Sequence, residues 1–122
     1  MLKDKDSSAI VAVADLQRAR AFYEDVLGLE LTQENEHVLE FRTGTTSLIV
    51  YLSDFAGTNK ANAVVWGVGA EIEAITAKLA DKGVSFEQYE GMDYANGIHR
   101  DGDYAMVWFK DPDGNILHLN NM

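Results

Sequence analysis

Apolar residues along the chain follow two periods, and the change from one to the other marks the elements. Short apolar, β-branched runs predict buried strands at 9–13 and 63–68. After each run, apolar residues recur at helical spacing until a glycine, Gly28 or Gly83, ends the pattern. The helical positions are Leu16, Ala19, Tyr23, Val26 and Leu27, and then Ile72, Ile75 and Leu79. The pattern therefore predicts two strand–helix pairs.

The two pairs have the spacing of an internal duplication. Asp15 stands where a helix N-cap is expected, because its carboxylate can accept a hydrogen bond from an exposed helical N–H. Glu71 holds the matching place in the second half. The distance along the chain from Asp15 to Glu71 is nearly the same as that from Gly28 to Gly83, which indicates a repeated unit.

Three strand-like runs follow each predicted helix. They are 29–33, 37–42 and 47–52 in the first half, and 84–90, 104–109 and 115–119 in the second. We therefore predict an α+β fold of two βαβββ modules. The single domain would span 1–122, with modules at 8–52 and 63–120 joined by a polar linker at 53–62.

Two further segments stand out in the second half. Residues 91–103 have no counterpart in the first half, and we expect a binding loop or lid there, with a merely decorative loop as the alternative. The stretch DPDG, residues 111–114, predicts a tight turn with Pro112 at its first central position. Asp111 and Asp113 are accordingly expected to form the turn and not to catalyse.

Composition narrows the classes of function. The chain has no cysteine, which excludes disulfides, thiolate nucleophiles and cysteine-bound metals. Its formal net charge of −10 repels phosphate backbones and mildly attracts cationic ligands, although the acidity can also serve only to keep the protein soluble. The first residues lack the apolar core of a signal peptide, and no apolar run reaches the roughly 20 residues of a membrane span. We expect a cytoplasmic protein that binds neither nucleic acid nor membrane.

Motifs at both ends of the chain resemble one known family. The stretch DLQRARAFYEDVLGLEL is similar to the helix signature of the vicinal oxygen chelate superfamily, which includes glyoxalase I, bleomycin-resistance proteins and extradiol dioxygenases. FKDPDGNILHL resembles its closing hairpin, and DKGVSFEQYE the strand after its second helix. The resemblance runs from about Ser8 to Leu119. It implies that the two modules form a curved, cleft-forming mixed sheet around a pocket, and that the protein is a homodimer.

The resemblance also implies where a metal would be held. In metal-using members, His, Gln or Glu ligands come from the first and last strand of each module. The matching positions here are Ser8, Ala63 (or Asn62 in a shifted alignment), Ile49 or Tyr51, and His118. Only His118 is a good metal ligand, whereas stable sites use three or four protein ligands. We therefore expect no cofactor and no metal, with a divalent ion as the alternative.

Strand alternation extends these positions to a predicted pocket. Val11, Val13, Val64 and Trp66 have the opposite parity and should face the helices. The predicted ligand pocket consists of Ser8, Ile10, Ser47, Ile49, Tyr51, Ala63, Val65, Met92, Tyr94, His99, Trp108, Ile116 and His118. Met92, Tyr94 and His99 would lie at its mouth, in the long loop.

His118 is the residue on which the functional hypotheses depend. It would orient a ligand in the pocket, or it would be satisfied by a neighbouring carbonyl. The hypothesis we favour is a metal-independent small-molecule-binding (sequestering) protein with a hydrophobic or cationic ligand. One alternative is a lyase- or dioxygenase-like enzyme with a degenerate or misaligned metal site; in the degenerate case His118 and Glu40 are the candidate acid and base. The other is a scaffold whose duplication serves dimerisation alone.

Overall fold

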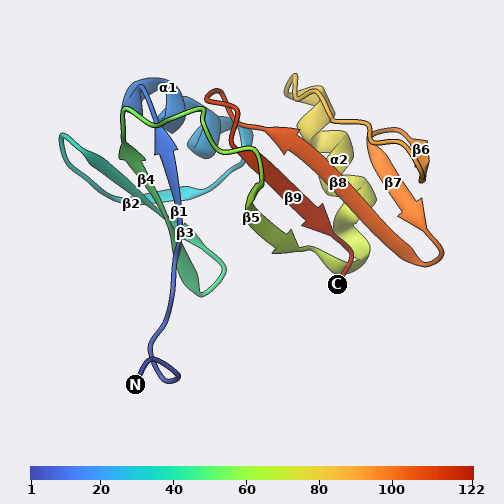
Figure 1. Ribbon diagram of the computed structural model, residues 1–122, viewed down its shortest axis with the longest axis horizontal. Coiled ribbons are helices and arrows are strands. Elements are labelled where there is room, and N and C mark those ends of the chain that lie inside the picture. Colours follow the sequence, from blue (N-terminus) through green and yellow to red (C-terminus); the bar gives the residue numbers. More distant parts are fainter. The chain divides into compact units, whose positions relative to one another are not determined.

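The computed structural model describes residues 1–122 and divides into two compact units, 1–58 and 59–122 (Figure 1). The first unit contains β1 (Ala9–Val13), α1 (Leu16–Arg20), the π-helical turn η1 (Ala21–Val26), β2 (Glu30–Glu34), β3 (Val38–Thr43) and β4 (Thr46–Leu52). The second contains β5 (Asn62–Gly67), η2 (Gly69–Glu71), α2 (Ile72–Asp81), β6 (Asp93–Ala95), β7 (Ile98–Asp101), β8 (Tyr104–Lys110) and β9 (Ile116–Asn120). Neither unit has a helix with the length and apolar character needed to cross a membrane.

The first unit is a four-stranded mixed sheet covered on one face by a helix. Its strand order is β1-β4-β3-β2, with β1 parallel to β4 and the other pairs antiparallel. Asp15 caps the helix as predicted, because its Oδ1 accepts a hydrogen bond from the Arg18 backbone N–H at 3.1 Å. The helix buries Tyr23 fully against the sheet, with its ring centroid 5.9 Å from that of Phe41. This contact fixes which face of the sheet becomes the core.

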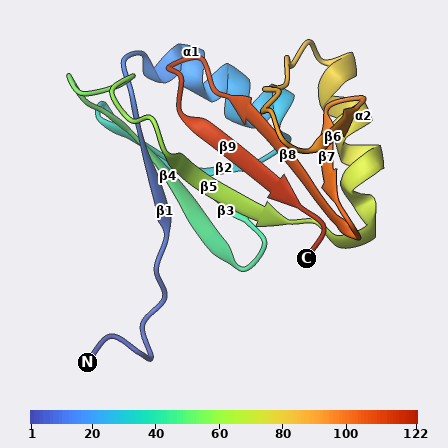
Figure 2. The same ribbon diagram turned by 45° about the vertical axis from the view of Figure 1, so that its right-hand side comes forward.

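The second unit repeats the plan with a longer sheet. The strand order is β5-β9-β8-β7-β6, with β5 parallel to β9, and α2 covers one face (Figure 2). Ile72 and Leu79 on α2 are buried, whereas Ile75 between them is half-buried. In both units the first strand runs parallel to the last and the helix follows the first strand. The predicted α+β fold built on βαβββ modules is therefore confirmed.

Two expectations for the second unit were wrong. Residues 84–90 do not form a strand: they make one bridge, Phe86 to Phe109, and one bond from the Glu87 N–H to the Trp108 carbonyl at 2.8 Å. Residues 91–103 are not a loop but largely the β6–β7 hairpin. Its turn is the dipeptide Asn96-Gly97, with φ of 54° and 85°, which is the two-residue turn that suits the twist of paired strands. The hairpin takes over the part of the β8 edge that 84–90 leaves unpaired.

The helix boundaries also differ from the repeat predicted by the sequence. Glu71 makes no side-chain cap, and α2 is instead preceded by the 3₁₀ turn that starts at Gly69. The first helix continues as the π-helical η1, whereas α2 is α-helical throughout. Gly28 and Gly83 do end the helical segments, with φ of 73° and 90°. The duplication is thus preserved at the helix ends and lost at the helix starts.

Candidate functional site

Alternation along the strands gives each sheet a buried face and a helix-free face. In β1, Val11 is 2% exposed on the helix side, while its neighbour Ile10 is 59% exposed on the other side. In β5 the same contrast separates Val64, at 8%, from Val65, at 57%. These two exposed side chains lie on the face of each sheet that no helix covers. The helix-free faces are therefore the candidate places for a site.

The residues predicted to line a pocket in the first unit lie on one helix-free face. Ile10 pairs with Ile49, and Ile49 pairs in turn with Glu40 on β3. Tyr51 is half-buried in the next row, and Ser47 lies at the other end of β4. Ser8, by contrast, precedes β1 and is exposed. The row contains one carboxylate and no imidazole.

The second unit gathers more of the predicted residues. Val65, His118 and Trp108 are paired in one row across β5, β9 and β8. Ile116 has the same parity on β9 but pairs with Asn62, because a bulge at Ala63 shifts the register. Met92 is half-buried and precedes β6.

Five rings form a continuous cluster on this helix-free face, which we call the aromatic row: Tyr89, Tyr94, His99, Trp108 and His118. Trp108 is the centre, since its ring centroid lies 4.7 Å from that of His118 in a stacked arrangement and 5.1 Å from that of His99, edge to face. Tyr94 continues the row at 4.7 Å from His99, and Tyr89 contacts both His99 and Trp108. Aromatic pairs in these geometries attract one another beyond simple burial. The row is therefore a packed aromatic wall on this face.

His118 is held in one tautomer by the strand beside it. Its Nδ1 lies 3.1 Å from the Val107 carbonyl oxygen, so Nδ1 carries the proton and donates it. Burial lowers the pKa of His118 below its ordinary value, and the bond to Val107 opposes that shift only in part. The residue is 8% exposed, and Nε2 has no partner in the protein. At neutral pH Nε2 is therefore an available hydrogen-bond acceptor.

His99 differs from its predicted place at a pocket mouth. It lies on β7 and is fully buried, at 0% exposure, because the rings of Tyr89, Tyr94 and Trp108 surround it. Its Nε2 accepts a hydrogen bond from the Tyr89 backbone N–H at 2.8 Å, which leaves the proton on Nδ1. Nδ1 is buried without a partner. The Asn-Gly turn signal in the sequence was the clue that would have placed His99 on a hairpin strand.

The turn between β8 and β9 fixes the pairing of Trp108 with His118. Asp111 is 4% exposed, and its Oδ1 accepts hydrogen bonds from the backbone N–H groups of Asp113 and Asn115, both at 2.9 Å. Its Oδ2 accepts from the Asn115 side-chain amide at 2.8 Å. The prediction that these acids form the turn is confirmed.

The donor set around His118 does not fit a divalent metal. The side chains beside it on the neighbouring strands are Val65 and Trp108, neither of which is a ligand. The other imidazole of the unit, His99, already uses Nε2 to accept a backbone N–H. No group of three His, Asp or Glu side chains converges to hold an ion. One available imidazole nitrogen is short of the three or four ligands that stable sites use.

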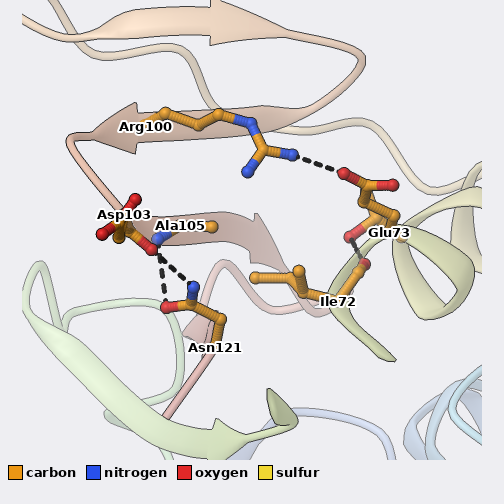
Figure 3. A network of polar contacts seen from close by, with 7 residues as sticks. Ile72, Glu73, Arg100, Asp103, Ala105 and Asn121 are labelled. Carbon is orange, nitrogen blue, oxygen red and sulfur yellow. Dashed lines mark hydrogen bonds and ion pairs between the residues drawn. The ribbon is translucent and has the colours of Figure 1, made fainter. Parts of the chain in front are cut away.

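A second concavity lies on the opposite side of the same sheet. A groove of about 740 Å³ separates α2 from the β6–β7 hairpin, with Thr76, Phe86 and Ile98 among its lining residues. Arg100 reaches from β7 to Glu73 on α2 at 2.8 Å, as Figure 3 shows. Figure 3 also shows Asn121, which donates to the Asp103 carbonyl and accepts from the Ala105 N–H, tying the C-terminal segment to the start of β8. These contacts link neighbouring segments of the unit without adding a reactive group.

Two βαβββ units, each with a helix-free sheet face, define a class of proteins built on a duplicated module. The profile of the Glyoxalase/Bleomycin resistance protein/Dioxygenase superfamily matches residues 7–119, and the chain belongs to this superfamily. Comparison with curated protein sequences found no match.

Solved structures share the fold at low sequence identity. A glyoxalase family protein from Enterococcus faecalis superposes with a TM-score of 0.76 at 22% identity, over 98% of this chain and 99% of that one. Lactoylglutathione lyase from Agrobacterium tumefaciens gives 0.73 at 18% identity, over 96% and 92% of the two chains. The fosfomycin resistance protein FosX from Mesorhizobium loti gives 0.73 at 13% identity, over 100% and 94%. At such identities the likeness concerns the fold alone.

Proposed function

We propose that this protein binds and sequesters a small, planar, largely hydrophobic molecule against the aromatic row, without a metal ion. The observation that supports this most is the row itself: three rings packed around Trp108, a fourth behind His99, and an exposed Val65 beside them. Small-molecule sites are mostly apolar and aromatic, with few polar groups that set orientation. The two histidine nitrogens without partners are such groups.

The proposal favours a binder over an enzyme because of what surrounds His118. Its neighbours on the adjacent strands, Val65 and Trp108, carry no acid or base that could take part in a reaction. Structural relatives that include a lactoylglutathione lyase and a fosfomycin resistance protein make an enzyme the alternative. A sequestering protein returns its ligand chemically unchanged, whereas an enzyme does not.

The test is a thermal-shift screen of planar aromatic compounds, with the two tryptophans as a matched pair. Trp108 lies in the aromatic row, whereas Trp66 has the opposite parity on the same sheet. We expect ligands that stabilise the wild type and Trp66→Phe equally and that bind Trp108→Leu at least about tenfold more weakly, because an aromatic wall supplies much of the affinity. Chelator should not change the result.

Three outcomes would contradict the proposal. Ligands that bind Trp108→Leu as tightly as wild type would place the site elsewhere, for instance in the groove beside α2. Binding that is abolished by chelator and restored by zinc, nickel, iron or manganese would show that a metal is required. Recovery of an altered ligand would favour the enzyme.

We also propose that the protein is a homodimer in the cytoplasm. The support for the dimer is the membership of the superfamily together with apolar side chains left exposed on both sheets, of which Ile10 and Val65 are the clearest. Light scattering at micromolar concentration should give twice the mass of the 13.5 kDa chain. A monomer mass would contradict the dimer and leave the small-molecule site untouched.

A further inference from the structure

The two histidines of the aromatic row present opposite hydrogen-bonding atoms, and the protein fixes both. His118 donates Nδ1–H to the Val107 carbonyl, so the atom that remains is Nε2, an acceptor. His99 accepts the Tyr89 N–H at Nε2, so the atom that remains is Nδ1–H, a donor. Both rings are thus in the same tautomer, yet each uses a different nitrogen internally. The backbone partners decide which atom is left.

The unused donor of His99 is costly in the free protein. The ring is 0% exposed, and a buried donor with no acceptor loses its hydration without replacement. A buried donor without an acceptor in a native structure indicates a hydrogen-bond partner from outside the chain. Since the ring is enclosed by other aromatic side chains, that partner has to arrive through the row.

Tyr94 is the side chain that can admit it. It pairs directly with His99, and its ring centroid is 4.7 Å away. It is half-buried and lies on β6, an edge strand of three residues whose pairing partner is β7 alone. An edge strand this short opens at lower cost than the interior of the sheet. Displacement of Tyr94 would open one side of the buried His99 ring.

The nearby charges argue for an uncharged ligand. Lys110, which follows Trp108 on the same face of β8, is already paired with Glu87 at 3.1 Å. The formal net charge of −10 repels anions, so the acceptor for His99 is better supplied by a carbonyl oxygen than by a carboxylate. Neither histidine, in the tautomer it holds, presents a charge.

We infer that the ligand of the aromatic row is an uncharged planar aromatic carbonyl compound bearing a hydroxyl group. This rests on the proposed function. The carbonyl oxygen accepts from His99 Nδ1–H, and the hydroxyl donates to His118 Nε2, so the ligand complements both unused atoms at once. No metal and no covalent step is required.

The test uses three planar bicyclic probes of similar size that differ in one group each. Umbelliferone has a hydroxyl and a carbonyl, its methyl ether herniarin lacks the donor, and naphthol lacks the carbonyl. Binding is measured by quenching of Trp108 fluorescence in Trp66→Phe, where Trp108 is the single tryptophan. We expect umbelliferone to bind about tenfold more tightly than either of the others, since each lost hydrogen bond leaves one buried atom unpaired.

Variants assign each preference to its histidine. His118→Phe should remove the preference over herniarin, because it keeps a ring on Trp108 and deletes the acceptor. His99→Phe should remove the preference over naphthol. Because that variant also leaves the Tyr89 N–H without its acceptor and is at risk of misfolding, ¹⁵N spectra of histidine-labelled wild type give an independent result. Both His99 and His118 should show a protonated Nδ1, and umbelliferone should shift His99 Nδ1 and His118 Nε2 while leaving the exposed His37 unchanged.

The outcomes separate the inference from the proposed function. Equal affinity for the three probes, or unchanged preferences in the variants, overturns the hydroxy-carbonyl class and leaves the aromatic site standing. A protonated Nε2 on either histidine overturns it as well. If none of the probes binds at millimolar concentration, the aromatic row is not a ligand site, and the proposed function falls with the inference.

Discussion

Replacing Asp111 by alanine should destabilise the second unit by about 3–5 kcal/mol. The carboxylate is 4% exposed and accepts three hydrogen bonds at 2.8–2.9 Å, two from backbone N–H groups and one from the Asn115 amide. A hydrogen bond to a charged acceptor contributes about 1.5–3 kcal/mol, and each buried donor left without a partner costs about 1–3 kcal/mol. The Asn115 donors are buried, while the Asp113 N–H is only part-buried. Simple addition therefore overstates the loss, and the middle of the range is expected.

Urea denaturation followed by tryptophan fluorescence measures this loss. Both tryptophans lie in the second unit, so the signal reports that unit alone. With a slope of roughly 2 kcal/mol per molar urea, the midpoint should fall by about 1.5–2.5 M. A change below about 1 kcal/mol would refute the idea that the Asp111 carboxylate organises the turn.

The control is a double variant that exchanges Asp111 and Asn115 and so keeps the net charge. Asp111→Asn keeps one side-chain oxygen that accepts from the backbone N–H groups. Its new amide N–H group replaces the other oxygen and faces the Asn115 amide, which is also a donor, so the variant should lose stability. Adding Asn115→Asp places a carboxylate opposite the new amide, so that a donor again faces an acceptor. The double variant should recover much of the lost stability. The same turn sets the pairing of Trp108 with His118, so Asp111→Ala should also weaken ligand binding to the aromatic row.

Three further predictions concern pH, backbone conformation and surface charge. Burial lowers the pKa of His118 in the folded protein below 6.5, so the folded protein favours the neutral ring. The stability that comes from this neutral ring is complete above pH 6.5 and is lost as the pH falls through the lowered pKa. The melting-temperature difference between wild type and His118→Gln should therefore shrink on acidification. Gly97→Ala should cost about 1–3 kcal/mol more than Gly91→Ala in urea, since both have φ near +90° but only at Gly97 does a new Cβ lie 2.8 Å from an aromatic ring carbon. Arg100→Gln should change the free energy of unfolding by less than about 0.5 kcal/mol despite its ion pair with Glu73, because both side chains are exposed; a larger loss would mean that the pair stabilises the groove.

Local pattern was enough to predict most of the fold. The switch between strand and helix periods located β1, α1, β4, β5, α2, β8 and β9, since burial of one face imposes its period on the residues themselves. The DPDG stretch predicted its turn because proline, aspartate and glycine restrict the backbone there without help from distant residues. The Asn-Gly turn was equally local, and the hairpin that it closes was predictable in principle.

The edge of the second sheet was decided only by tertiary packing. Residues 84–90 have a strand-like composition, yet β7 occupies much of the β8 edge that they would need. Strand propensity records how well a side chain fits a half-buried surface, and it does not say which of two segments wins the partner. Because β7 and not 84–90 pairs with this part of β8, His99 on β7 lies in the interior of the unit.

The chemistry of the candidate site was likewise decided by contacts distant in sequence. The sequence determined that His118 follows a tight turn on an apolar strand, and alternation gave its face. Which nitrogen each histidine leaves unused depends on the Val107 carbonyl for His118 and on the Tyr89 N–H for His99. Both partners come from neighbouring segments brought close by folding. An imidazole has two equivalent choices until a fixed donor or acceptor removes one, and only the three-dimensional arrangement of backbone groups makes that selection.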